Sequence, residues 1–146
     1  MIKNTVSIIT IVLNNVKEIE KAIKSVQSQN YPLIEHIVVD GGSTDGTLEI
    51  VKQASSKKIK FISESDNGIY DALNKGIALA TGDVVAILHS DDEFYDEYVV
   101  SDVMEYMEEA ESEFCFSDMV IVDSLSRKVL RYYMAHYFKR WMFRIG

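Results

Sequence analysis

The sequence has 146 residues, of which 47% are hydrophobic and 26% charged, and its formal net charge is −8. These values are typical of one globular domain with a substantial core, and such an acidic protein is a poor nucleic-acid binder. No apolar run reaches the roughly 18 residues that a membrane span needs. The single Cys115 cannot form an internal disulfide, which suits a reducing compartment, so we expect a cytoplasmic protein.

Hydrophobic periodicity predicts alternating strands and helices over the first 88 residues. We expect strands over residues 6–13, 34–39, 59–62 and 84–88, and helices over residues 19–26, 48–54 and 69–80. Asn14 and Asn15 are residue types that cap helices, and Gly82 stands where a glycine would end the third helix. Repeated alternation of this kind predicts an α/β fold with a parallel sheet and right-handed crossovers.

The remainder of the chain predicts a helix over residues 99–110 and two strands over 114–122 and 129–133, joined as a hairpin. No repeat, low-complexity segment or linker marks a second domain. We therefore expect residues 1–146 to form a single domain.

Two adjacent carboxylates, Asp91 and Asp92, follow the apolar run 84–88, whose composition predicts a strand buried on both faces. Hard oxygen ligands of this kind suit Mg²⁺ or Mn²⁺, and a diphosphate would complete the coordination shell. The stretch 90–93 also fits the capping box S-x-x-E, so the same acids could simply begin a helix. The stretch alone leaves both interpretations open.

Two more strand ends carry acids, with Asp40 closing the second predicted strand and Asp66 following the third. In a parallel sheet these ends share one edge, where ligands of open α/β sheets bind. The phosphate-binding patterns G-x-G-x-x-G and G-K-[ST] are absent from the sequence. An acidic edge without such a loop favours a site in which a metal holds the phosphates.

Five short stretches together resemble family 2 glycosyltransferases of the GT-A fold, in the order and spacing of that family. They are SIITIVLNN (7–15), SVQSQNYP (25–32), VVDGGSTDGT (38–47), DNGIYDALNKG (66–76), and ATGD (80–83) running into SDD (90–92). The resemblance implies a mostly parallel sheet flanked by helices. It also implies a nucleotide-diphosphate sugar as donor, with a UDP-sugar favoured.

The same resemblance implies roles for individual residues. Asp91 and Asp92 match the D-x-D region, which holds a divalent metal, Mn²⁺ or Mg²⁺, together with the sugar nucleotide. His89 stands at the first position of that motif, which is often acidic in relatives, so the ribose contact differs here. The implied nucleotide-binding residues are Leu13, Asn14, Asp40, Asp66, His89 and Asp91.

Family resemblance further implies inverting transfer of the sugar to a polysaccharide or a lipid-linked acceptor. The catalytic carboxylate of this family is expected beyond Gly146, together with much of the acceptor site, so we expect a truncated chain. An alternative is a non-catalytic nucleotide-sugar-binding remnant or interaction module, which shares every motif.

Charge is distributed unevenly along the chain. Residues 127–146 contain six Arg or Lys and no acid, whereas residues 1–126 contain nine Lys against all 23 acids. Aromatic residues interleaved with cations are typical of segments at a membrane surface. Weak peripheral association with the inner face of the membrane is therefore one interpretation, and packing against further protein is the other.

Overall fold

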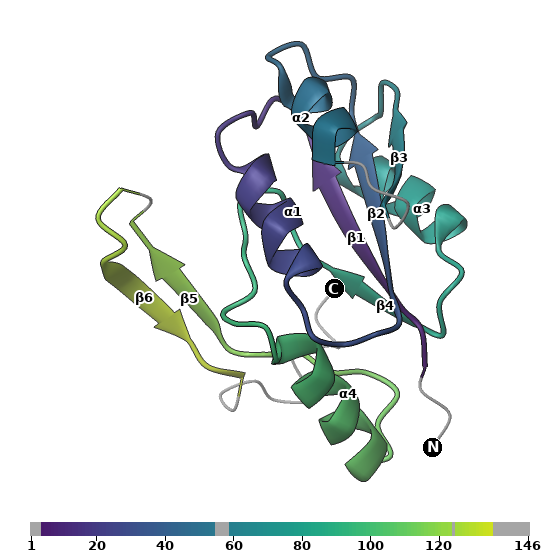
Figure 1. The fold of residues 1–146 in the computed structure, drawn as a ribbon, viewed down its shortest axis with the longest axis vertical. Coiled ribbons are helices and arrows are strands. Elements are labelled where there is room, and N and C mark those ends of the chain that lie inside the picture. The colour runs from purple at the N-terminus through teal and green to yellow at the C-terminus, as the bar shows by residue number, and fades with distance from the viewer. Residues whose placement is uncertain (1–3, 55–58, 124, 136–146) are drawn as a thin grey trace. The chain divides into compact units, whose positions relative to one another are not determined.

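The computed structural model of the chain describes residues 4–54, 59–123 and 125–135. The chain divides into two units, Met1–Asp102 and Val103–Gly146. In the described residues, the first unit contains a parallel sheet with three helices, and the second contains an antiparallel hairpin (Figure 1).

The sheet of the first unit contains four strands among the described residues, in the order β3-β2-β1-β4. All three strand pairs are parallel. The strands are β1 (Val6–Val12), β2 (Ile34–Asp40), β3 (Ile59–Ser63) and β4 (Val84–Ile87). Every residue of β1 is buried, because this strand is central and the sheet is covered on both faces. The predicted parallel α/β sheet is confirmed.

Helices cover the two faces of the sheet separately. Helices α1 (Ile19–Gln27) and α2 (Thr47–Ala54) bury Ile23 and Val51 against β1 and β2. On the opposite face α3 (Ile69–Leu79) buries Ala72 with Ile9, Ile11, Ile37 and Val39. Adjacent side chains of a strand point to opposite faces, so the all-apolar strands supply both cores.

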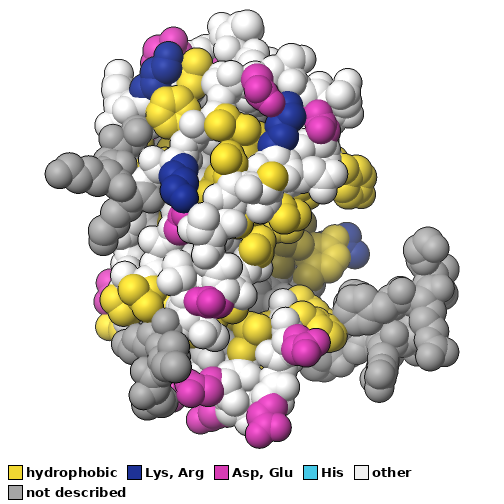
Figure 2. All heavy atoms as spheres, turned by 90° about the vertical axis from the view of Figure 1, so that its right-hand side faces the viewer, with side chains coloured by type: hydrophobic (Ala, Val, Ile, Leu, Met, Phe, Trp, Pro, Cys, Tyr) yellow, Lys and Arg dark blue, Asp and Glu magenta, His cyan; other side chains and the backbone are white. Residues whose placement is uncertain are grey.

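Among the described residues, strand β4 lies at the edge of the sheet. It is half-exposed rather than buried on both faces, so that expectation is wrong. Val85 and Ile87 are 44% and 50% exposed, and they pair with Ser7 and Ile9 of β1. Helix α3 packs against β1 and β2, which leaves this face of β4 open. Figure 2 shows hydrophobic side chains at the surface, among acidic and basic ones, on the side where α3 and β3 lie in Figure 1.

Two expectations about helix ends are also wrong. The residue that caps the start of α1 is Glu18, which makes no side-chain capping bond. Helix α3 ends with Ala80 as its capping residue. Gly82 instead lies against β1, where a Cβ would come within 2.6 Å of the Thr5 carbonyl oxygen. The glycine therefore permits close approach to a strand, which only the tertiary structure reveals.

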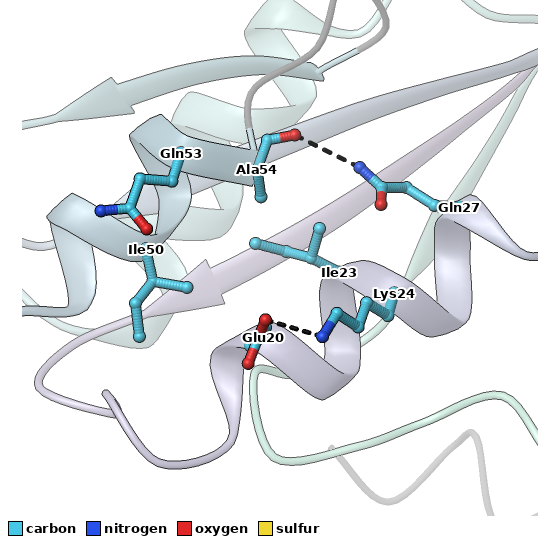
Figure 3. A pocket seen from close by; sticks show the side chains of 7 residues that line it. All are labelled: Glu20, Ile23, Lys24, Gln27, Ile50, Gln53 and Ala54. Atoms are coloured by element: carbon cyan, nitrogen blue, oxygen red, sulfur yellow. Dashed lines mark hydrogen bonds and ion pairs between the residues drawn. The ribbon is translucent and has the colours of Figure 1, made fainter.

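A hollow of about 300 Å³ lies between α1 and α2 (Figure 3). Two polar contacts border it: the ammonium of Lys24 lies 2.7 Å from a Glu20 carboxylate oxygen, and the Gln27 amide donates to the Ala54 carbonyl at 3.3 Å. Ile23 lines the hollow, whereas none of the predicted site residues does.

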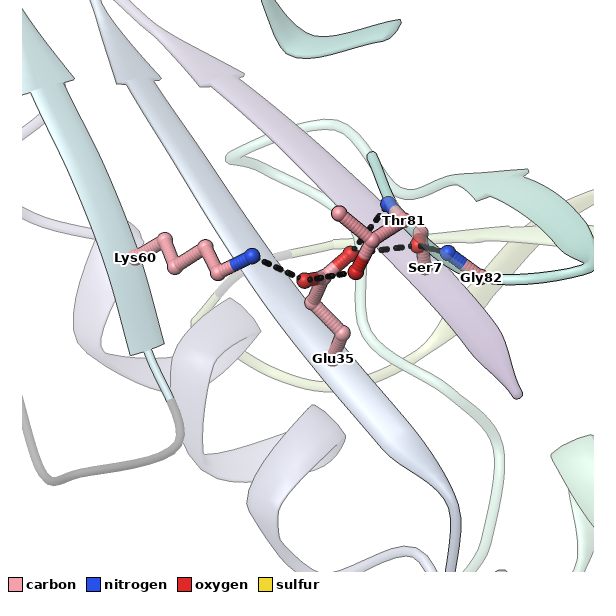
Figure 4. A network of polar contacts seen from close by, with 5 residues as sticks. All are labelled: Ser7, Glu35, Lys60, Thr81 and Gly82. Atoms are coloured by element: carbon pink, nitrogen blue, oxygen red, sulfur yellow. Dashed lines mark hydrogen bonds and ion pairs between the residues drawn. The ribbon is translucent and has the colours of Figure 1, made fainter. Parts of the chain in front are cut away.

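The carboxylate of Glu35 is the centre of a polar network on the α3 face of the sheet (Figure 4). It accepts hydrogen bonds from the Ser7 hydroxyl at 2.6 Å and from Lys60. It also accepts from the N–H of Thr81 at 2.9 Å and from its hydroxyl at 2.8 Å. The network joins β1, β2 and β3 to the connection that leads into β4.

Helix α4 (Val99–Glu109) contains the boundary between the two units. The second unit continues with β5 (Met119–Val122) and β6 (Val129–Tyr133), which pair antiparallel. The predicted hairpin is confirmed, although β5 is shorter than the predicted strand over 114–122. In the part of the chain that the structure describes, no helix is long and apolar enough to cross a bilayer.

Candidate nucleotide-sugar site

Parallel pairing brings the carboxyl ends of the four strands to one edge of the sheet. The residues that follow these ends are Leu13 and Asn14 after β1, Gly41 to Gly46 after β2, Asp66 after β3, and His89 to Asp92 after β4. The predicted convergence of residues far apart in the sequence is therefore confirmed at the level of the strand ends.

Asp40, the last residue of β2, is completely buried. Its carboxylate accepts a hydrogen bond from the Ser63 hydroxyl at 2.6 Å and from the Ser43 N–H at 3.1 Å. The carboxylate thus ties the loop after β2 to the end of β3. Because the side chain is covered, a direct contact with a ligand requires the loop to move.

Leu13, Gly41 and Asp66 lie together at this edge, each from a different strand end. A Cβ placed on Gly41 would be 2.5 Å from Oδ2 of Asp66 and 3.4 Å from a methyl carbon of Leu13. The other oxygen of Asp66 accepts the Gly68 N–H at 2.9 Å. Leu13 is 57% exposed, so an aliphatic surface adjoins a hydrogen-bond acceptor. A planar base with an N–H donor matches this combination.

The loops after β1 and β2 are held together by short polar side chains. The N–H of Asn14, which has a φ of 51°, donates to the Ser43 hydroxyl at 2.8 Å. The Asn14 side-chain oxygen accepts the Thr44 N–H at 2.9 Å, and Asp45 accepts the Val16 N–H at 3.0 Å. Hydrogen bonds from Thr47 and then Val16 lower the pKa of Asp45. Sequence reasoning assigned no role to Ser43 or Asp45, although a loop rich in such residues commonly bonds to backbone groups.

The acid pair occupies a turn, closed by the hydrogen bond from the Asp92 N–H to the His89 carbonyl at 3.1 Å. The capping-box interpretation of 90–93 is wrong, because the next helix, α4, begins only at Val99. Burial, together with the neighbouring charge of Asp91, raises the pKa of Asp92, while His89 opposes this shift. Both effects penalise a second negative charge, which a bound cation would relieve.

Asp91 is exposed, while Asp92 and His89 are half-buried. Within the described ranges, no group of three or more His, Cys, Asp or Glu side chains is placed to hold a metal ion. Two carboxylates are hard oxygen donors that fit Mg²⁺ or Mn²⁺, but they supply only part of the coordination shell. Ligand oxygens would have to supply the rest.

Comparison with known proteins places the chain in a family. The chain matches a model described as Glycosyl transferase family 2 over residues 7–144. It is 43% identical over 102 residues to an uncharacterized glycosyltransferase of Mycobacterium tuberculosis, covering 69% of this chain and 39% of that protein. The chain therefore spans well under half of this relative's length.

Solved structures agree with the family match. A mannosyltransferase from Pyrobaculum calidifontis in complex with GDP-Man and Mn²⁺ is similar at a TM-score of 0.68 and 26% identity, covering 72% of this chain and 32% of that one. TarS from S. aureus in complex with UDP-GlcNAc is similar at a TM-score of 0.67 and 26% identity, and the match covers 87% of this chain and 37% of TarS. The fold is that of GT-A glycosyltransferases, and the chain belongs to glycosyl transferase family 2.

Proposed function

We propose that this protein binds a nucleotide-diphosphate sugar, with a UDP-sugar favoured, together with Mn²⁺ or Mg²⁺. It would form the donor-binding part of an inverting glycosyltransferase. The observation that carries the proposal is the convergence of Leu13, Asp66 and the Asp91–Asp92 turn at one edge of the sheet. The similar mannosyltransferase and TarS, in complex with GDP-Man and UDP-GlcNAc respectively, support it.

The nucleoside would lie against Leu13 and Asn14. An N–H of its base would donate a hydrogen bond to Oδ2 of Asp66. Asp40 would orient this part of the site, mainly by holding Ser43 and Ser63 in place. His89, half-buried after the end of β4, would approach the ribose with its imidazole ring. An acidic residue at this position would instead accept hydrogen bonds from the ribose hydroxyls.

Asp91 and Asp92 would hold the metal, with diphosphate oxygens completing its shell. When bound, the metal supplies Lewis-acid stabilisation of the departing diphosphate. The acceptor hydroxyl would attack C1 of the sugar while the bond from C1 to the diphosphate oxygen breaks. A general base would take the hydroxyl proton, and the acceptor would be a polysaccharide or a lipid-linked glycan.

Calorimetry with UDP and with GDP, each in Mn²⁺ and in chelator, tests the donor site. UDP should bind more tightly in Mn²⁺, and Asp91→Asn or Asp92→Asn should remove this difference. Asp102→Asn, an exposed acid in α4, is the matched control and should behave as wild type. Equal binding in Mn²⁺ and chelator would contradict the metal assignment, and absence of binding to both nucleotides would contradict the proposal. Sugar transfer by this chain would contradict the non-catalytic alternative.

Association with a membrane surface is proposed on the sequence of 127–146 alone, and most of that tail lies outside the described residues. Each cation near an anionic surface is worth about 1 kcal/mol. Co-sedimentation with anionic vesicles should be weak, lost at high salt and lost when Lys139, Arg140 and Arg144 become Gln. Equal binding to neutral vesicles would leave packing against further protein as the explanation.

A further inference from the structure

Asn15 makes hydrogen bonds to the first residue of α2 and to the turn after β4. Its N–H donates to the Thr47 hydroxyl oxygen at 2.9 Å. Its side-chain amide donates to the Ser90 hydroxyl oxygen at 3.1 Å, across 75 residues of sequence. One residue therefore connects the start of α2, directly after the loop that follows β2, with the turn that carries Asp91 and Asp92.

The main chain of Asn15 is firmly placed. Thr47 is completely buried, and its hydroxyl donates to Oδ1 of Asp45 at 2.5 Å. Oδ2 of Asp45 accepts the N–H of Val16, the next residue, at 3.0 Å. Asp45 in the loop after β2 and Thr47 at the start of α2 thus fix the main chain at Asn15 and Val16. The Asn15 side chain extends from this fixed main chain toward Ser90.

Ser90 receives this contact inside the acid turn. The pairing of β4 with β1 ends at the hydrogen bond from the Leu88 N–H to the Ile9 carbonyl at 3.0 Å. Beyond it, the bond from Asp92 to His89 makes Ser90 and Asp91 the two central residues of the turn. Ser90 is buried, with 9% of its surface exposed, so the turn is anchored through the residue that directly precedes the acids.

We propose that Asn15 is a positioning residue, which fixes the Asp91–Asp92 turn relative to the loops that would hold the nucleoside. The inference rests on the donor site proposed above. Two neighbouring carboxylates repel each other and separate when their turn is free. The hydrogen bond from Asn15 keeps the turn, and with it both carboxylates, in one arrangement before the cation binds. Cation binding then costs less conformational entropy.

Binding of UDP by the full chain, measured by calorimetry in Mn²⁺ and in chelator, gives the first test. Asn15→Ala and Ser90→Ala each remove one hydrogen bond. Each should reduce the ratio of UDP affinity in Mn²⁺ to UDP affinity in chelator about three- to tenfold. UDP affinity in chelator should change less than about twofold. An equal loss in both conditions would show a general structural role and overturn the proposal, as would an unchanged ratio.

Matched variants sharpen this result. Ser90→Thr keeps the hydroxyl and should restore the Mn²⁺ effect that Ser90→Ala loses. The double variant Asn15→Ala/Ser90→Ala should be no worse than either single variant, because both remove the same bond. Ser28→Ala and Asn30→Ala make the same substitutions at exposed positions near the end of α1. As controls, they should leave the Mn²⁺ effect unchanged. Additive losses in the double variant would contradict a shared contact.

Amide hydrogen exchange of Asp92 tests the inference without any ligand. The Asp92 N–H closes the turn, so its exchange should quicken in Asn15→Ala and Ser90→Ala and return to the wild-type rate in Ser90→Thr. Unchanged exchange would overturn the positioning role even if UDP binds. Absence of UDP binding in the wild-type chain would instead overturn the donor site, and the exchange rates would still decide whether Asn15 holds the turn.

Discussion

One carboxylate oxygen of Asp66 lies so close to Gly41 that a Cβ at the glycine would be 2.5 Å away. Cβ atoms do not approach an oxygen this closely, so a side chain at position 41 must displace Asp66. The carboxylate also accepts the Gly68 N–H, and a displaced Asp66 would weaken this bond. The conformation of the loop after β2 therefore determines the position of the Asp66 carboxylate, a hydrogen-bond acceptor after β3.

We predict that Gly41→Ala weakens binding of uridine by about 1–2 kcal/mol through a misplaced Asp66. Calorimetry with uridine measures this. Gly42→Ala is the comparison: Gly42 has a φ of 89°, but a Cβ there meets nothing closer than 3.6 Å. This variant should lose stability through backbone strain and retain more of the uridine affinity. Similar affinities of the Gly41 variant and wild type would contradict the role of Asp66.

A second prediction concerns Glu35, whose side chain is 12% exposed. Burial by itself raises the pKa of Glu35, but hydrogen bonds from Lys60, Ser7 and Thr81 outweigh it and lower the pKa from 4.5 to about 2. A lowered pKa means that the unfolded chain binds protons first. Stability from this group is therefore complete above pH 4.5 and is lost as the pH falls toward 2.

Glu35→Gln should lower the free energy of unfolding by about 1–3 kcal/mol at neutral pH, as measured in urea. The difference from wild type should shrink as the pH falls from 4.5 toward 2. Glu20→Gln removes an exposed ion pair with Lys24 and should cost less than about 0.5 kcal/mol. Equal costs of the two substitutions would contradict a central role for Glu35.

His36, the next residue of β2, titrates in a different pH interval. It is 2% exposed, and its Nε2 lies 3.0 Å from the Thr10 hydroxyl oxygen. Its Nδ1 is buried without a hydrogen-bond partner in the described residues. Burial lowers the pKa of His36 from 6.5 to about 4. The unfolded chain takes up this proton first, so stability is complete above pH 6.5 and falls between pH 6.5 and 4.

We expect the free energy of unfolding to drop by up to about 3 kcal/mol across that interval. His36→Gln keeps a hydrogen-bonding group for Thr10 but does not titrate, so its stability should vary less with pH. Urea unfolding at several pH values measures both curves. Parallel curves for wild type and variant between pH 6.5 and 4 would contradict this assignment.

Gln29 gives a fourth prediction, since its buried amide joins α1 to the segment before α4. The amide nitrogen donates to the carbonyls of Asp96 at 2.6 Å and Ser25 at 3.1 Å, and the oxygen accepts the Val100 N–H at 3.0 Å. Gln29→Leu leaves these groups unpaired and should cost about 2–3 kcal/mol of stability in urea. Gln53→Leu, at an exposed position of α2, should be nearly neutral, and equal losses would argue against the amide bonds.

Local patterns were sufficient for the sheet and for the acids at its edge. Strand β1 and Asp40 were predictable because apolar runs set strands and parallel strands share an edge. The contacts that shape the edge were not predictable. Gly82 was misread as a helix end because its partners, Thr5 and Ser7, lie more than 70 residues away, and the bond from Asn15 to Ser90 depends on how β1 and β4 pair.

The central position of β1 also has a consequence for synthesis of the chain. This strand leaves the ribosome before both of its neighbours in the sheet, and the second of them, β4, begins only at Val84. At 5–20 residues per second, about 4–15 s separate the end of β1 from the end of β4. During that time VSIITIV, seven residues without proline or charge, has an unpaired edge of the kind that aggregates. A chaperone that binds apolar segments would find a target here, before the Asp91–Asp92 turn after β4 exists.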